Sequence, residues 1–137
     1  MAALWAAAAL ALAPGSSPHA QARSLLAGCR GALATVRLVA VSAHSAALPA
    51  MVRTTREASD RCDLIQPLEQ LVEAHAKDPA LQRALSAGMN LTLGLGGYTQ
   101  YLAEAAFGRQ TGAELRKAIA QIQAGRRETA AALQALA

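Results

Sequence analysis

Aromatic residues are scarce in this sequence, which holds one Trp, one Phe and two Tyr in 137 residues. Alanine supplies much of the 53% hydrophobic fraction and buries little area per side chain, so we expect a thin core. Charged residues make up only 16% of the chain, and the net charge is +4. Such a weak charge is no sign of a nucleic-acid-binding surface, and we expect no nucleic-acid partner.

The motifs of several enzyme and cofactor classes are missing as well. Cys29 and Cys62 are the only cysteines, so the chain has neither a Cys-x-x-Cys pair nor a Cys-x-x-Cys-His haem motif. It has no His-Glu-x-x-His zinc motif, and the glycines of residues 94–97 lack the Lys-Ser/Thr ending of a phosphate loop. We therefore expect a protein that is not an enzyme and that holds no metal and no cofactor.

No apolar run reaches the roughly 20 residues that span a bilayer. The longest, residues 1–13, precedes the helix-breaking residues 14–18 and then Ala20-Gln21-Ala22, a small-x-small pattern typical of leader cleavage. The sequence predicts a removed leader at residues 1–22 and a single domain at residues 23–137. We expect a periplasmic or secreted protein with no transmembrane segment in the mature chain. The alternative is a cytosolic protein whose first helix is residues 1–13.

The tetrad Leu26-Ala27-Gly28-Cys29 allows two roles for its sulfur. Cys29 can form a disulfide with Cys62 in an oxidising compartment, and the midpoint of the two positions falls in an expected turn near residue 45, as in an antiparallel hairpin. Alternatively, the tetrad is a lipobox and acylated Cys29 anchors an envelope lipoprotein. A lipobox directly follows its apolar run, whereas residues 14–23 intervene here. We predict the disulfide; two unpaired thiols are the third arrangement.

An apolar repeat with alternating spacings of three and four predicts a helix over residues 23–43. Its inward positions are Leu26, Cys29, Leu33, Val36, Ala40 and Ala43. Arg30 and Arg37 lie beside this row of inward positions, seven residues apart, and form a basic line. That line is either a surface for an acidic partner or a solvated flank whose arginine stems cover apolar side chains.

Three more helices are predicted, the first of them broken. A helix over residues 49–63 is followed by a break at Pro67, a restart near 64–67 and an end at residue 77, because proline disrupts a helix interior. A helix over residues 80–107 contains glycines that mark either a break or a close neighbour, and Thr111 opens the last helix. The predicted fold is all-α, a small antiparallel bundle of about four helices with one disulfide.

The candidate functional surface is the stretch where the aromatic residues meet the glycines. Tyr98, Tyr101 and Phe107 lie there, and with Arg30 and Arg37 they are the predicted contact residues for an unidentified protein or envelope partner. We expect an exported, non-enzymatic interaction protein of the bacterial cell envelope. The alternatives are a small-ligand or haem carrier with a cavity lined by Met89, Tyr98 and Tyr101, or a lipoprotein. A further alternative is that the aromatic rings only fill the core.

Overall fold

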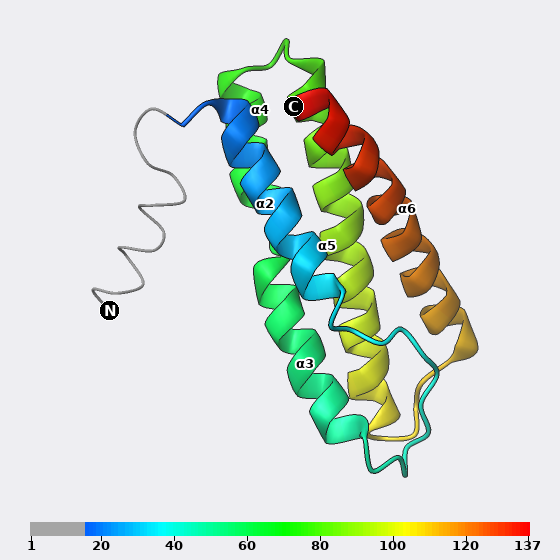
Figure 1. Cartoon of the computed structure of the whole chain (residues 1–137). Helices are drawn as coiled ribbons and strands as arrows, with labels where there is room; N and C mark the ends of the chain where they lie inside the picture. Colours follow the sequence, from blue (N-terminus) through cyan, green and yellow to red (C-terminus); the bar gives the residue numbers. More distant parts are fainter. Residues whose placement is uncertain (1–15) are drawn as a thin grey trace.

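Helices make up most of the chain that the structure, a computed structural model, describes, namely residues 16–137. They are α2 (Pro18–Leu33), α3 (Leu48–Arg61), α4 (Ile65–Ala74), α5 (Pro79–Ala105) and α6 (Gly112–Leu136). Neighbouring helices run antiparallel, with α3 and α4 following each other along one side of the bundle (Figure 1). The prediction of a small all-α bundle is confirmed. The expected leader lies outside the described residues up to position 15.

Local start signals set the beginnings of three helices. Ser17 caps α2 with its hydroxyl, which accepts a hydrogen bond from the Ala20 amide, and Pro18 occupies the first turn. Asp78 caps α5 through bonds from the Ala80 and Leu81 amides. Thr111 caps α6 by accepting from the Glu114 amide, as expected for a capping box. The prolines and polar residues before these helices therefore start them rather than only interrupting the chain.

The prediction of one helix over residues 23–43 is wrong. α2 begins at Pro18, inside the expected leader, and ends at Leu33. Residues 34–47 form a non-helical segment, here called the strap, that leads to the start of α3 (Figure 1). Its β-branched Val36, Val39 and Val41 favour extended backbone. The apolar spacing could not distinguish a helix from an extended chain here, because Val36 is a buried position in either case.

The predicted break in the second long helix is confirmed, and it lies at residues 62–64. Pro67 occupies the first turn of α4, where a missing N–H leaves no helical bond unmade. The Thr92 hydroxyl of α5 lies at the break, donates to the Cys62 carbonyl (2.7 Å) and accepts from the Leu64 amide (3.2 Å). One side chain therefore satisfies two backbone groups that the break frees.

Two glycines bring α5 and α6 close together. A Cβ on Gly94 would lie 2.9 Å from the Ile122 amide nitrogen, and a Cβ on Gly125 would lie 2.9 Å from the Leu91 amide nitrogen. Each helix therefore places a large side chain against a glycine of the other. The helix over residues 79–105 is continuous through its glycines, so close packing rather than a break explains them.

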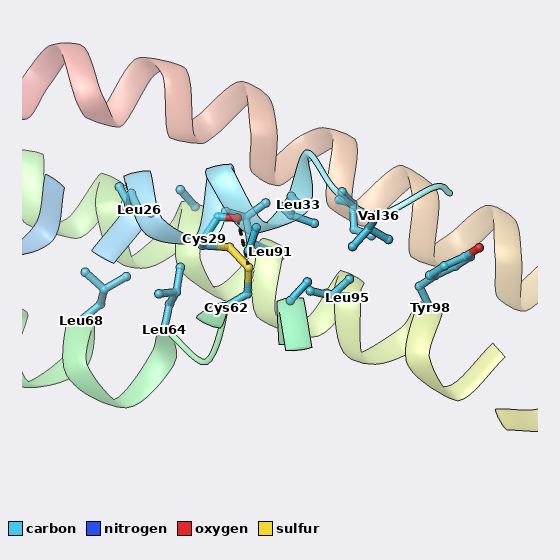
Figure 2. Packing of buried hydrophobic residues seen from close by; sticks show 14 of the residues in the cluster. Leu26, Cys29, Leu33, Val36, Cys62, Leu64, Leu68, Leu91, Leu95 and Tyr98 are labelled. Atoms are coloured by element: carbon cyan, nitrogen blue, oxygen red, sulfur yellow. Dashed lines mark hydrogen bonds between the residues drawn. A yellow bond between two sulfur atoms is a disulfide. The ribbon is translucent and has the colours of Figure 1, made fainter. Parts of the chain in front are cut away.

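The disulfide between Cys29 and Cys62 lies at the centre of the core. It joins α2 to the end of α3, with a Cα–Cα distance of 4.6 Å, and both residues are buried. Figure 2 shows the bridge among leucines of α2, of the break between α3 and α4, and of α5, including Leu26, Leu64 and Leu91. The predicted pairing is confirmed, and the chain has no other cysteine.

Candidate functional site

The two tyrosines predicted as contact residues point into the core. Tyr98 and Tyr101 are buried, and their stacked rings have centroids 5.9 Å apart. Both hydroxyls reach the strap, whose residues 37, 39 and 41 present backbone groups to the same side, as in an extended chain. The tyrosines therefore hold the strap against α5, and their rings are not accessible to a partner in this structure.

Tyr98 makes the more extensive set of bonds to the strap. Its hydroxyl lies 2.8 Å from the Arg37 carbonyl oxygen and 2.9 Å from that of Val39, either of which accepts its proton, and it accepts from the Val39 amide. Burial raises the pKa of Tyr98, because the tyrosinate would lose its hydration. The hydroxyl is therefore a neutral donor. Tyr101 is held by one bond, which it accepts from the Val41 amide.

We expect Tyr98→Phe to lower the free energy of unfolding by about 1–2 kcal/mol, since backbone groups of the strap lose their partner. The amide of Val39 should exchange its hydrogen faster. Urea unfolding and hydrogen exchange measure the two effects, with Tyr101→Phe as the matched control that removes one bond. Equal losses in the two variants would contradict the leading role of Tyr98.

The remaining predicted contact residues lie at the surface but apart from one another. Phe107 is 74% exposed in the α5–α6 loop, with the Arg109 guanidinium 5.6 Å from its ring centroid. Arg30 is exposed in the last turn of α2, and exposed Arg37 lies in the strap. The structure therefore does not gather the predicted residues into one site.

The residues of the predicted carrier cavity do not converge. Met89 is 40% exposed on the outer side of α5, whereas Tyr98 and Tyr101 face the core. Nine residues separate Met89 from Tyr98, which is two and a half helical turns and places them on opposite faces. The geometry therefore gives no support to a haem or ligand pocket made by these three side chains.

The outer seam between α5 and α6 contains a groove of about 400 Å³, here called the α5–α6 groove. It is lined by Leu93, Gly97 and Gln100 of α5 and by Glu114, Lys117, Ala118 and Gln121 of α6. Its walls are mainly carbon, and Leu93 at its edge is 51% exposed. Gly97 lies next to the buried Ala118, and a Cβ added to Gly97 would lie 3.4 Å from the Ala118 Cβ. The groove thus combines an apolar floor with a polar rim.

The predicted functional stretch and the α5–α6 groove share only part of their residues. The stretch 94–107 contains the buried tyrosines, whereas its contribution to the groove is Gly97 and Gln100. Leu93 could have been found from helical spacing, since Met89, Leu93 and Gly96 lie along one stripe and all three are exposed. The pairing with α6 had no sequence signal.

Charge on the described surface is largely unpaired. Between residues 16 and 137 the one ion pair is His19–Asp78, with the imidazole Nε2 2.6 Å from the carboxylate Oδ2. The hydrogen bond from His19 is the main cause that holds the pKa of Asp78 below its usual value. The basic side chains of the chain, eleven arginines and two lysines, thus have no carboxylate within ion-pair distance there.

A second hollow of about 420 Å³ lies between α2 and α3. Its lining includes Thr35, Glu57, Asp60 and Arg61, and all four are exposed.

In the part of the chain that the structure describes, no group of three His, Cys, Asp or Glu side chains is placed to hold a metal ion. None of the helices α2–α6 is both long and apolar enough to cross a membrane.

These features define the class of the molecule as a disulfide-bridged antiparallel helical bundle with a groove on the outer side of its long hairpin. No protein-family model matches the chain, and neither the curated proteins nor the solved structures include one that matches it. The bundle and the groove therefore have to be interpreted from their own geometry.

Proposed function

We propose that this chain is an exported, non-catalytic interaction protein of the bacterial cell envelope and that the α5–α6 groove is its interaction surface. The main observation in support of export is the buried Cys29–Cys62 disulfide, because such bridges persist mainly in oxidising compartments. The bridge also favours this role of Cys29 over acylation, since a sulfur in a disulfide is not free to carry a lipid. The apolar residues 1–13 agree with export.

The occupant that the groove fits best is a second copy of this chain. Its rim carries one acid, Glu114, and one base, Lys117, and neither has an ion-pair partner among residues 16–137. In an antiparallel pair related by a twofold axis, Glu114 of each copy meets Lys117 of the other. Leu93 supplies exposed apolar area at the edge of the same groove. Exposed apolar area bordered by polar and charged side chains is typical of protein interfaces, in which a polar rim surrounds an apolar centre.

Sedimentation velocity of the purified oxidised protein over a range of concentrations tests this pairing. We expect a reversible dimer whose dissociation constant rises at least about 30-fold in Leu93→Asp, because the substitution replaces the exposed apolar side chain of the groove by a carboxylate that pairing would desolvate. Lys117→Glu should raise the dissociation constant about tenfold, because it places a second acid against Glu114.

Lys77→Glu is the matched control, since Lys77 and Lys117 are the two lysines of the chain and Lys77 lies in the exposed α4–α5 connection. It makes the same change in net charge and should leave the dimer unaltered. A protein that stays monomeric at every concentration would overturn the second copy as occupant. If Lys77→Glu and Lys117→Glu weakened the dimer equally, net charge rather than the groove would be responsible.

A photoreactive residue at position 93, with one at exposed Gln70 of α4 as control, tests the groove itself in envelope fractions of a bacterial host. Cross-links at position 93 between copies of the chain support the proposal. Cross-links from position 93 to a different protein, blocked by Lys117→Glu, would keep the groove and replace its occupant. Equal labelling from both positions would overturn the groove as the interaction surface.

A further inference from the structure

The first turn of α2 is built from residues that the sequence assigns to the leader. Ser17 caps the helix with its hydroxyl, and its carbonyl accepts from the Gln21 amide. The Gln21 side chain reaches back to the Ser16 carbonyl at 3.0 Å. A chain beginning at Arg23 would lack this capped turn and would place a new ammonium group at a helix N-terminus, where positive charge is unfavourable.

The same turn is tied to the rest of the bundle. His19 donates to the Asp78 carboxylate, whose other oxygen caps α5. Ala22 is completely buried in the core. The next residue, Arg23, donates from its guanidinium to the carbonyl of Leu136 near the end of α6. Residues 17–22 therefore connect the start of α2 to the start of α5 and belong to the folded domain.

We propose that leader cleavage takes place at the bond between Gly15 and Ser16, so that residues 17–22 remain in the mature protein. This inference rests on the proposed export. Ala13 and Gly15 supply the small residues at the third and first positions before the bond, the same pattern as Ala20 and Ala22. Water adds across the peptide bond, leaving a carboxylate on Gly15 and an amine on Ser16. The product begins immediately before the α2 N-cap.

The intact mass of the exported full-length gene product, carrying a C-terminal tag, tests the cleavage position. We expect a chain that begins at Ser16 and is lighter by two hydrogens because of the disulfide. A chain that begins at Arg23 with the disulfide formed would overturn this inference and leave export standing. An uncleaved, reduced chain in the cytoplasm would overturn the export on which it rests. An acylated chain beginning at Cys29 would overturn the cleavage position and the disulfide and would leave export standing.

Matched leader variants separate the two cleavage patterns. Gly15→Gln places a large side chain directly before the proposed bond and should accumulate uncleaved precursor. Ala20→Gln places the same side chain at the third position before the alternative bond between Ala22 and Arg23, and it should leave processing unchanged. The reverse result, with precursor in Ala20→Gln alone, would overturn the inference.

A stability measurement on the exported protein tests whether the retained turn is part of the fold. His19→Ala should lower the thermal midpoint by about 5 °C, because the bond to Asp78 is lost. His75→Ala, which removes an exposed imidazole at the end of α4, should leave the midpoint unchanged. Equal midpoints in the two variants would show that the first turn of α2 does not hold the bundle and would overturn its assignment to the folded domain.

Discussion

Replacing both cysteines by alanine is expected to lower the free energy of unfolding by about 3–4 kcal/mol. The bridge joins residues 33 positions apart, and a cross-link over a loop of this length removes about that much conformational freedom from the unfolded chain. The loss is a large part of the stability of a small domain, which is about 5–15 kcal/mol in total. Urea unfolding of Cys29→Ala/Cys62→Ala against the oxidised protein measures it.

The denaturant dependence provides a second readout of the same change. An unbridged chain exposes more surface when it unfolds, so the slope of free energy against urea should rise in the double variant. Chemical reduction of the unaltered protein is the control, since it opens the same loop without removing either side chain. A loss below about 1 kcal/mol in both cases would show that the helices pack independently of the bridge.

Gly125→Ala is expected to lower the free energy of unfolding by about 2–3 kcal/mol, although alanine is the better helix former by about 1 kcal/mol. The added Cβ would lie 2.8 Å from a Leu91 side-chain carbon and 2.9 Å from the Leu91 amide nitrogen. A flexible side chain can move, but backbone cannot move without separating α5 from α6. Gly94→Ala should act similarly, because its Cβ would meet the Ile122 amide nitrogen at 2.9 Å.

The same substitution at Gly96 should have the opposite sign. Gly96 is exposed on α5, and an added Cβ meets no atom within 4 Å, so Gly96→Ala should raise the free energy of unfolding by about 0.5–1 kcal/mol through helix propensity alone. Urea unfolding of the three alanine variants compares the same added methyl group at two positions where the helices touch and at one position where it faces solvent. Equal effects at positions 96 and 125 would contradict the close approach of the two helices.

The strap shows what helical periodicity cannot distinguish. Val36 is buried at the position where a helix over residues 23–43 would also bury it. The decision between helix and extended chain comes from Tyr98 and Tyr101, about sixty residues away, whose hydroxyls bind alternate residues of the strap. A local pattern contains no information about hydrogen-bond partners that distant.

The tyrosines and glycines of α5 show the same limit for the site. Their clustering indicated a functional stretch, but whether each residue faces the core or solvent depends on where α6 and the strap lie. A Cβ added to Gly94 would lie too close to Ile122, whereas a Cβ added to Gly96 would meet no atom within 4 Å, although the two glycines are only two residues apart. The α5–α6 groove follows from this arrangement, because its lining comes from two helices that meet only when the hairpin is folded.

The sequence by itself determined the helical class, the caps at Asp78 and Thr111 and the break before Pro67, and it favoured the pairing of Cys29 with Cys62. These depend on local hydrogen bonding, on the rigid proline ring and on the presence of only two cysteines. Tertiary structure alone decided the end of α2, the burial of the tyrosines and the close contact of α5 with α6. Those features depend on which surfaces meet across the bundle, and only the folded chain brings these surfaces together.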